Sequence, residues 1–432
     1  MLRRKFLAVL PASAAMAQYG PPVTESGAVA DGRTLATEAV QRAIDAVASK
    51  GGGTVWFPAG RYLCGTLRLR SRTRLHLDPG AVLLGSTRLS HYPSHVPKFR
   101  SYADTYVEQS LIYAEGEEDV GIEGEGTIDG QGAAFKGHYK VRPYMIRFIN
   151  CRNVSVRDVT LRNSPMWVQH YLACDGVAIR DVTVQSRVNA NNDGIDIDCC
   201  DRVRISGCDI SSGDDAIVLK STADRVCRNV TVTNCVLSTA CSALKLGTES
   251  NGGFENIAVS NCTIYQTRLG GIAIETVDGG VLDGVSFSNI IMDGVGAPLF
   301  VRLGHRARPF REGGPKPGMG IMRNIQVTGI QARSAGRTGC AISGLPGHDI
   351  ENLTLENLRF LFAGGGKKRD GEAPELPEKY PEFNMFGDLP AYGLWCRHVR
   401  GLELRNIQLT TAAPDARPPV LFEDVKELKK DF

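Results

Sequence analysis

Short runs of alternating apolar and polar residues recur along most of this 432-residue chain, and most of the runs end at Gly, Asn or Asp. Alternation with a period of two is typical of β-strands that bury one face. Copies of one such phrase follow each other at a nearly constant step, starting at Asn153, Gly176, Arg202, Asn229 and Asn256. Later copies start at Gly284, Asn324, Asn352 and Gly401.

A repeat of this kind predicts a solenoid. One unit cannot bury its own apolar face, whereas stacked coils can, with parallel strands about 4.7–4.9 Å apart along the stack. Leucine-rich repeats have a similar period, but their fixed Leu-rich signature is absent. We therefore predict an all-β fold, a right-handed parallel β-helix.

The region before the repeats predicts one helix over residues 35–49, ended by the glycines at 51–53. Its apolar positions follow the i, i+3, i+4, i+7 pattern of an amphipathic helix: Val40, Ala43, Ile44 and Val47. Thr34 is the expected N-cap. Because an exposed solenoid end would leave strand edges unpaired, we expect this helix to cap the stack.

Residues 18–432 are expected to form a single β-helix domain, in which residues 20–90 make the N-terminal cap and the first coils. A polar, Gly- and Pro-rich loop insertion over residues 363–390 interrupts the repeats. This insertion is either a disordered loop or a wall of a binding cleft.

Residues 1–17 have the pattern of an export signal. Arg3, Arg4 and Lys5 precede a short apolar run, and small residues at 15–17 fit a cleavage site. The pattern suits a twin-arginine signal as well as an ordinary secretory one. No other stretch approaches the roughly 18 apolar residues of a membrane span. We therefore expect a periplasmic or secreted protein with no membrane partner.

Charge and cysteine content change this picture little. The chain has 50 Lys and Arg against 47 Asp and Glu, and removal of the three basic residues of the signal leaves a neutral protein. That balance neither favours nor excludes a polyanionic partner. We expect no nucleic-acid partner, and we expect a monomer because a β-helix completes its own core.

Twelve cysteines would suggest disulfides in an exported protein, but Cys208, Cys235 and Cys262 are evenly spaced by one repeat, which predicts a ladder of reduced core residues.

The residues with chemical potential concentrate in two adjacent repeats. An Asn-x-Asp motif that begins at Asn191 is followed by Gly-Asp-Asp at 213–215, so that Asp193 precedes Asp214 by nearly one coil. Clustered carboxylates repel each other and lose hydration, so a purely structural role explains them poorly. Inverting glycosidases use an acid and a base carboxyl group roughly 6.5–9.5 Å apart. A one-coil offset with a lateral displacement can reach that range.

Neighbouring polar residues have simpler explanations. Asp196 and Asp198 alternate with isoleucines and are expected to be structural, as is His170. Trp167 either stacks on a sugar or fills the interior. No cluster of His and Cys has the short spacing of a metal site, so we expect no metal and no cofactor.

These motifs resemble those of the polygalacturonases and their relatives, glycoside hydrolase family 28. The likeness begins at Asp31-Gly-Arg-Thr, continues through residues 51–62 and 162–167, and includes both aspartate motifs. It implies inverting hydrolysis of a pectin-type plant polysaccharide on a right-handed parallel β-helix. It also implies that Asp214 is the general acid, and that Asp193 and Asp215 hold the attacking water.

The chain departs from the family at the specificity motifs. Cys241-Ser242-Ala243 stands where the family usually has Gly-His-Gly, and Ala273-Ile274-Glu275 stands where it has Arg-Ile-Lys. A glutamate there should repel a galacturonate. Relatives that cleave rhamnogalacturonan also lack the His, so the resemblance implies a rhamnogalacturonan or another decorated galacturonan, or a neutral sugar terminus, rather than plain polygalacturonate.

Other residues on these and the next coils are candidates for substrate contacts. A carboxylate or cation in the right place in the repeat can bind sugar hydroxyl or carboxylate groups. The candidates are Asn191, Lys245, Glu249, Glu275, Asp278, Arg302, His305 and Arg306.

Two other classes of protein remain open. A polysaccharide lyase on this fold would use clustered carboxylates for Ca²⁺, but no matching Arg or Lys base motif accompanies them. A carbohydrate-binding β-helix without catalysis would explain the missing His and cations.

Overall fold

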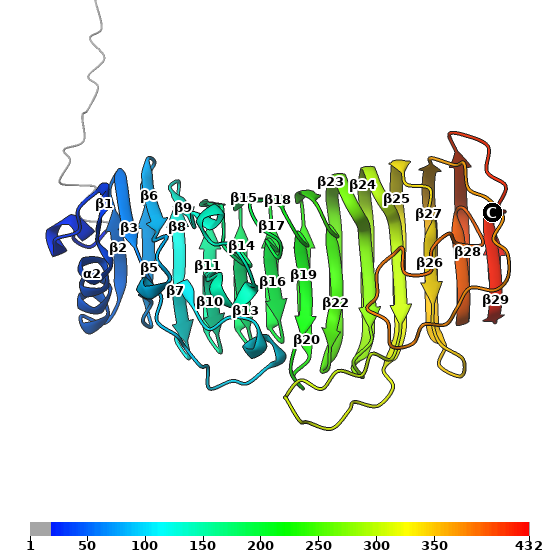
Figure 1. Ribbon diagram of the computed structural model, residues 1–432, viewed down its shortest axis with the longest axis horizontal. Helices are drawn as coiled ribbons and strands as arrows, with labels where there is room; N and C mark the ends of the chain where they lie inside the picture. Colours follow the sequence, from blue (N-terminus) through cyan, green and yellow to red (C-terminus); the bar gives the residue numbers. More distant parts are fainter. Residues whose placement is uncertain (1–18, 432) are drawn as a thin grey trace, which may run out of the picture.

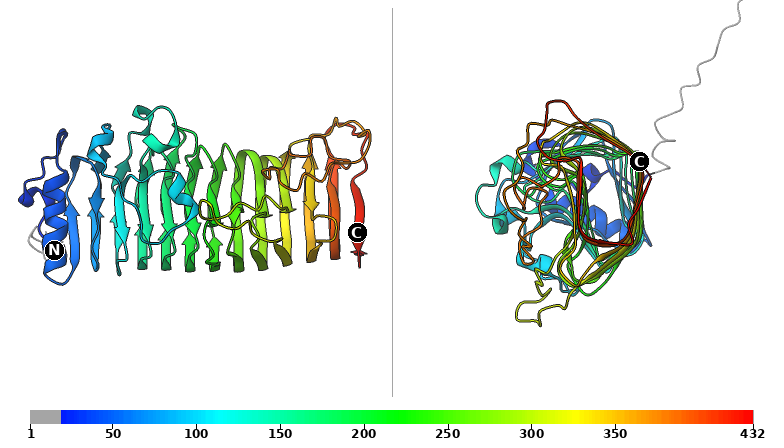
Figure 2. Two further views of the ribbon diagram at one scale, coloured as in Figure 1. Left: turned by 60° about the horizontal axis from the view of Figure 1, so that its bottom comes forward. Right: turned by 90° about the vertical axis from the view of Figure 1, so that its right-hand side faces the viewer.

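The computed structural model describes residues 19–431, and the predicted export signal lies outside them. The strands pair in parallel within one continuous sheet. This sheet winds into coils that stand side by side along the long axis (Figure 1) and superimpose in the end-on view (Figure 2). The prediction of an all-β parallel β-helix is confirmed. Its right-handed sense is the one that parallel crossover connections almost always adopt.

Each coil in the middle of the chain contributes three strands, and each strand pairs with its counterparts one coil before and after. The first column holds β7 (Ser110–Glu115), β10 (Tyr144–Ile149), β13 (Gln169–Leu172), β16 (Ile195–Asp198), β19 (Ile217–Ser221) and β22 (Leu244–Ser250). The second column holds β8 (Gly121–Gly124), β11 (Arg152–Arg157), β14 (Asp175–Arg180), β17 (Asp201–Ser206) and β20 (Cys227–Thr233). The third column holds β9 (Thr127–Asp129), β12 (Thr160–Arg162), β15 (Thr183–Ser186), β18 (Asp209–Ser212) and β21 (Val236–Thr239).

The two ends of the stack are built differently. Later coils contain long strands: β23 (Gly253–Thr276), β24 (Val281–Leu303), β25 (Ile321–Ala335), β27 (Ile350–Phe362) and β28 (Leu394–Thr411). Shorter strands there are β26 (Cys340–Ser343), β29 (Val420–Lys426) and β30 (Lys429–Asp431). The first coils hold β1 (Asp31–Leu35), β2 (Gly53–Phe57), β3 (Gly60–Cys64), β4 (Leu67–Arg68), β5 (Thr73–Leu77) and β6 (Ala81–Gly85). Short 3₁₀ turns are η1 (Val23–Ser26), η2 (Leu89–His91), η3 (Tyr102–Thr105), η4 (Gly132–Ala134) and η5 (Tyr139–Val141).

The interior consists of rows of like side chains. Ile195, Ile217 and Leu244 are aligned partners in consecutive coils, and each is at most 2% exposed. Because side chains alternate along a strand, this register directs one set of residues inward and the next set outward on every coil. The outward set of the first column is the one that carries the polar residues described below.

The asparagines that punctuate the repeats make the turns. Asn229 and Asn256 have φ values of 56° and 53°, a left-handed conformation that asparagine adopts more readily than most residues. The Asn256 side-chain amide donates to Oδ1 of Asn229 at 3.2 Å. The repeated Asn is therefore both a turn residue and a rung in a hydrogen-bonded ladder.

The cysteine prediction is also confirmed. All twelve cysteines lie in the described range and are free thiols, and eleven of them are buried. Cys208, Cys235 and Cys262 each direct Sγ toward a backbone carbonyl oxygen two residues earlier. Cys241, near the carboxylate cluster, is the one that is only partly buried.

A helix, α2 (Thr37–Ser49), occupies the range predicted for it and lies at the N-terminal end of the stack (Figure 1). Its buried face includes Val40 and Ile44. The prediction of Thr34 as N-cap was wrong, since the N-cap is Ala36. Thr34 instead lies in β1, where its N–H and hydroxyl both donate to the carboxylate of Asp31 at 2.8 Å.

None of the helices within residues 19–431 is both long and apolar enough to cross a membrane. Long loops leave the coil stack at residues 86–109, 304–320 and 363–393 (Figure 2). The last of these packs on the sheet through an apolar cluster that includes Phe386 and Trp395. The loop thus has its own contacts with the coils and brings side chains over the first strand column.

Candidate active site

The aspartates predicted from the sequence meet in a cavity of about 230 Å³ over the first strand column. Its walls come from the coils and from all three long loops, so that residues far apart in the sequence face one another. The lining residues are Tyr106, Tyr139, Met166, Trp167, Asn191, Asp193, Asp214, Asp215, Lys220, Glu249, Arg308 and Tyr380.

Asp193 lies two residues before β16 and is held there by its neighbour Asn192. The side-chain carbonyl oxygen of Asn192 accepts from the backbone N–H groups of Val188 and Asn189 at 3.1 and 2.9 Å. Its amide donates to the backbone carbonyls of Ser164 and Met166 at 2.8 and 3.0 Å. Because Asn192 is fully buried, this network fixes the turn that presents Asp193.

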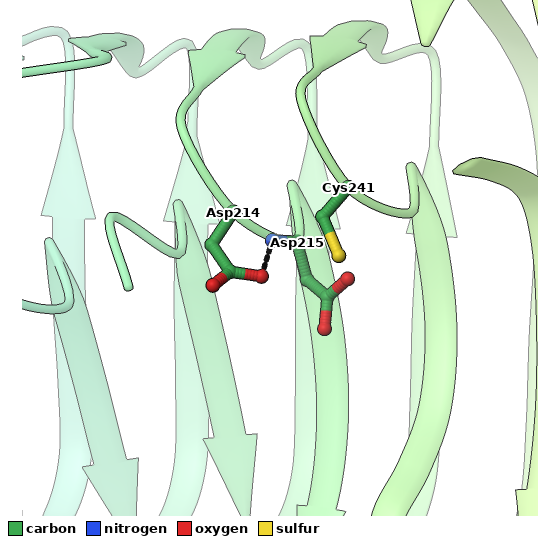
Figure 3. Close-up of side chains that lie close together, drawn as sticks. All are labelled: Asp214, Asp215 and Cys241. Atoms are coloured by element: carbon green, nitrogen blue, oxygen red, sulfur yellow. Dashed lines mark hydrogen bonds between the residues drawn. The ribbon is translucent and has the colours of Figure 1, made fainter. Parts of the chain in front are cut away.

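Asp214 and Asp215 occupy the equivalent turn of the next coil, before β19. The Asp215 N–H donates to Oδ1 of Asp214 at 3.0 Å, and both carboxylates point to the same side of the turn (Figure 3). Oδ1 of Asp215 accepts from the backbone N–H of Ser242 at 3.0 Å. Ser242, at the position where the family usually has His, therefore contributes through its main chain.

Lys245 compensates the charge of Asp215. Its Nζ lies 3.1 Å from Oδ2 of Asp215 and 4.0 Å from Oε2 of Glu275, and its side chain is 3% exposed. Burial by itself would raise the pKa of Asp215, but Lys245, Lys220 and the Ser242 N–H together lower it. The surroundings of Asp215 therefore favour its ionised form.

The pKa of Asp214 moves in the opposite direction. Burial and the adjacent charge of Asp215 raise it, and Lys245 offsets this only in part. Burial, followed by the charges of Asp214 and Asp196, raises the pKa of Asp193 well above its ordinary value. The cavity thus holds carboxyl groups whose environments separate their protonation states, which is the arrangement that acid–base catalysis requires.

Lys220 is the central cation of the cavity. Its Nζ lies 3.5 Å from Glu249, 3.7 Å from Asp196 and 3.9 Å from Asp193. It also lies 4.8 Å from the centre of the Trp167 ring. Trp167 is 4% exposed and lines the cavity, and it packs with Tyr106 and Tyr144 in an apolar cluster separate from the main core.

Glu249 links the coils to the loop at 304–320. Its carboxylate forms ion pairs with Lys220 and with Arg308, and Arg306 lies 3.8 Å away. Although burial opposes it, these three cations lower the pKa of Glu249. Asp278 completes the network by pairing with Arg306 and by accepting the N–H of Arg308 at 3.0 Å.

Some of the other predicted contact residues line the cavity and others lie outside it. Asn191 lines the cavity, and its Oδ1 accepts from Arg142 Nη2 at 2.8 Å. Glu275 lies behind Lys245, outside the cavity lining, and accepts from the Thr248 hydroxyl at 2.9 Å. Burial raises the pKa of Glu275 to about 8. Glu275 does not line the cavity, so the expected repulsion of a galacturonate by Glu275 stays a prediction.

Arg302 does not reach the cavity, so its prediction as a substrate contact is contradicted. Its guanidinium is 1% exposed and donates to Ser343 Oγ at 2.8 Å and to the backbone carbonyl of Glu375 at 2.6 Å. Both acceptors belong to the protein, and Glu375 lies on the loop at 363–393. Arg302 therefore anchors that loop.

The residues predicted to be structural behave as such. His170 Nε2 lies 3.1 Å from Asp198 Oδ2, and both side chains are fully buried. Asp198 also accepts from the N–H and hydroxyl of Thr222 at 2.9 and 2.6 Å. Asp196 is different, since neither carboxylate oxygen has a hydrogen-bond donor within the described residues.

A metal ion has few ligands here. Asp214, Asp215 and Cys241 each offer one atom within 4.8 Å of the others (Figure 3). The ammonium group of Lys245 already lies against Asp215, and its charge opposes a cation at that point. The donor set therefore fits a metal poorly.

Several site residues were missed in the sequence. Lys220 was detectable, because it alternates with Ile217 and Leu219 and is aligned with Asp198 one coil earlier, which places it on the outward face. Tyr106, Tyr139 and Tyr380 carry no such signal. They come from loops, where no period relates a residue to a face.

Comparison with known proteins identifies the family of this chain. The family described as glycosyl hydrolases family 28 matches residues 60–372, and the family described as rhamnogalacturonase A/epimerase, pectate lyase-like, matches residues 22–85. A probable polygalacturonase from Vitis vinifera is 34% identical over 221 residues, which are 48% of this chain and 45% of that protein. The chain thus spans about half the length of the curated relatives it matches.

Solved structures show the same fold. The family 28 exopolygalacturonase of Yersinia enterocolitica aligns with a TM-score of 0.77 and 20% identity, over 95% of this chain and 78% of that one. An exopolygalacturonase of Thermotoga maritima aligns with a TM-score of 0.70 and 23% identity, over 79% of this chain and 87% of that one. Since the match to the family extends over residues 60–372, the chain belongs to glycosyl hydrolases family 28.

Proposed function

We propose that this protein hydrolyses O-glycosidic bonds in a pectin-type plant cell-wall polysaccharide, with inversion at the anomeric carbon. The observation that carries the proposal is that two neighbouring carboxyl groups in one cavity have pKa values shifted in opposite directions. The pKa of Asp214 is raised, whereas that of Asp215 is lowered. Inverting glycosidases need one carboxylic acid and one carboxylate at the same time.

Asp214 is the general acid. In its protonated form it donates a proton to the glycosidic oxygen as the bond to the anomeric carbon breaks. The leaving sugar departs as a neutral alcohol, and the raised pKa keeps the proton available at mildly acidic to neutral pH. The hydrogen bond from the Asp215 N–H to Oδ1 of Asp214 holds the carboxyl group in place.

Asp215 is the general base: together with Asp193 it holds a water molecule and removes its proton, and the water oxygen attacks the anomeric carbon from the face opposite the leaving group. One oxygen of Asp215 lies within 4.8 Å of one of Asp214, closer than the roughly 6.5–9.5 Å usual in inverting enzymes, so the anomer seen by NMR is the direct test of inversion. Lys245 keeps Asp215 ionised. Asp193, with Oδ1 free of protein hydrogen bonds within the described residues, completes the binding of that water from the adjacent coil.

Two cations and the aromatic walls support recognition of an acidic sugar. Lys220 and Arg308 line the cavity and share one carboxylate, that of Glu249. Tyr380, 47% exposed, offers a ring face from the loop at 363–393. These groups substitute for the absent Arg-Ile-Lys motif and favour a galacturonan, plain or decorated.

The cavity also favours action at a chain end. Tyr106 and Tyr139 enclose it from loops before the aspartate coils, and Arg308 and Tyr380 enclose it from loops after them. Walls on both sides limit the room for a continuous polymer, and the two structural relatives described above are both named as exopolygalacturonases. We further propose that the protein is exported, acts as a monomer, and needs no metal or cofactor.

The test is sugar release from a panel of polygalacturonate, rhamnogalacturonan, xylogalacturonan and arabinogalactan. Reducing ends should appear with at least one galacturonan, the first product should be short, and NMR should show the inverted anomer. A product that absorbs in the ultraviolet through a new double bond would instead indicate a lyase. Binding without any cleavage would indicate a carbohydrate-binding protein and would refute the hydrolase proposal.

Lys245→Met should move both limbs of the pH profile of kcat/KM to higher pH. Asp215 must be ionised, so activity rises as the pH passes upward through its lowered pKa, and loss of Lys245 raises that pKa. Asp214 must be protonated, so activity falls as the pH passes its raised pKa, which Lys245 partly lowers. The profile should be measured on the best polymer of the panel.

Lys50→Met, which removes an exposed lysine of the N-terminal region, is the control and should leave the profile in place. An unshifted acid limb in Lys245→Met would contradict the assignment of Asp215 as the base.

A further inference from the structure

A second concave surface lies on the strand column that follows the active-site column in each coil. It is a shallow trough of about 580 Å³ whose lining shares no residue with the catalytic cavity. The trough is lined by Arg74, Asp119, Asn153, Val154, Ser155, Gly176, Ala178, Arg180, Arg202 and Arg204.

The floor of the trough follows from the register of the coils. Gly121, Ser155, Ala178 and Arg204 are aligned partners on β8, β11, β14 and β17. Small residues at three successive outward positions leave a depression that the arginine side chains of the next coil enclose. Arg74 on β5 aligns with Gly121, which puts a basic residue at each end of a row four coil steps, or about 19 Å, long.

The positive charge of the trough is not compensated. Arg180, Arg202 and Arg204 are exposed, and none of them forms an ion pair with a carboxylate of residues 19–431. Their neighbours differ, since Arg157 pairs with Glu123 at 2.8 Å and Arg228 pairs with Asp201 at 3.1 Å.

The other charges around the trough do not cancel this excess. The lining holds one carboxylate, Asp119, against four arginines. Arg74 forms an ion pair with Glu123 at 3.5 Å, which leaves the other three arginines of the lining against Asp119.

Arg202 stands in an unusual backbone position. The aligned turn residues of the coils on either side are Asn153, Gly176 and Asn229, with φ values of 55°, 74° and 56°. These residue types tolerate the left-handed region, whereas Arg202 adopts φ 58° without that advantage. A side chain kept at a cost to the backbone is a reason to look for a function.

We propose that this trough binds a carboxylated polysaccharide chain, separately from the catalytic cavity. The planar guanidinium group pairs with a carboxylate through two parallel hydrogen bonds, and a row of arginines along the stack suits an extended polymer with a repeating carboxylate. The choice of a polyuronate over another polyanion rests on the proposed function. Binding here would hold the enzyme on its polymer while the cavity acts on chain ends.

The test measures binding to polygalacturonate by affinity electrophoresis in the Asp214→Asn background, so that the polymer is not degraded. The trough variant is Arg180→Ser/Arg202→Asn/Arg204→Thr, in which each new residue is the one aligned with it on the next coil, namely Ser206, Asn229 and Thr231. Three exposed charge contacts correspond to a loss of affinity of about tenfold. The matched control removes three exposed arginines of the C-terminal coils: Arg333→Gln/Arg359→Gln/Arg405→Gln.

The proposal is supported if the trough variant loses affinity and the control stays within about twofold of the parent. Equal losses in both variants would show general charge attraction, and unchanged affinity in the trough variant would show no site, so either result overturns it. If double-stranded DNA competes for the trough as strongly as polygalacturonate does, the assignment to a polyuronate is overturned. With Asp214 intact, the trough variant should cleave short oligomers at the wild-type rate, which separates this proposal from the catalytic one.

Discussion

Asp214→Asn should lower kcat on the preferred galacturonan by roughly 10²–10⁴-fold, the usual contribution of a general acid. The asparagine keeps the shape of the side chain and an oxygen that accepts the Asp215 N–H, so the turn and the neighbouring charges are preserved. What is lost is the proton for the leaving oxygen. Steady-state kinetics on the polymer, together with thermal unfolding to verify the fold, make the measurement.

An activated aryl galacturonide distinguishes loss of the acid from general damage. A nitrophenolate leaves without protonation, so its hydrolysis should fall far less in Asp214→Asn than that of the polymer. Asp209→Asn, which alters an exposed aspartate on the neighbouring strand β18, is the matched control and should keep wild-type activity. Equal losses on both substrates would mean that Asp214 is not the acid.

Lys220→Met should destabilise the protein by about 3–5 kcal/mol, the range observed when one partner of a buried ion pair is removed. Its side chain is 7% exposed and lies within 3.9 Å of Asp193, Asp196 and Glu249. Chemical denaturation of the two proteins at several pH values makes the measurement.

The destabilisation should depend on pH in a defined direction. Without Lys220, the pKa values of Asp193 and Asp196, which are already raised in the fold, rise further. A carboxyl group whose folded pKa is raised favours the folded state while it is protonated, and this contribution is lost as the pH rises through that pKa. The difference between Lys220→Met and wild type should therefore be smaller at pH 5 than at pH 8.

A second substitution tests the cause. Asp196 has no hydrogen-bond donor within the described residues, so Lys220→Met/Asp196→Asn should recover part of the lost stability by removing one uncompensated carboxylate. No recovery would attribute the loss to packing against Trp167 rather than to charge. Lys50→Met again serves as the exposed control.

The parts of this molecule that could be predicted are those governed by the coil period. The spacing of Asp193 and Asp214 by nearly one repeat placed both carboxylates in one cavity because adjacent coils are in register. The same period identified the buried cysteine ladder. The period also predicts that Lys220 faces outward, because it alternates with Ile217 and Leu219, but Lys220 was not among the predicted site residues.

Residues outside the period could not be placed in this way. Arg302 is predicted to contact the substrate because it is a cation on a further coil, yet its guanidinium donates to protein oxygens on β26 and on the loop at 363–393. Tyr380 lines the cavity from that same loop. The path of a long loop depends on its own packing, which neither composition nor spacing reveals. Likewise, Thr34 met the residue preference of an N-cap, but pairing of β1 with β3 took priority.

The stacking of like residues in register also determines how the protein unfolds. Each coil contacts mainly its two neighbours, so opening should begin at the terminal coils and spread inward. The coils that carry Asp193, Asp214 and Lys245 have further coils on both sides. Catalytic geometry should thus outlast fraying of either end, and loss of activity on heating should lag behind the first loss of β-structure.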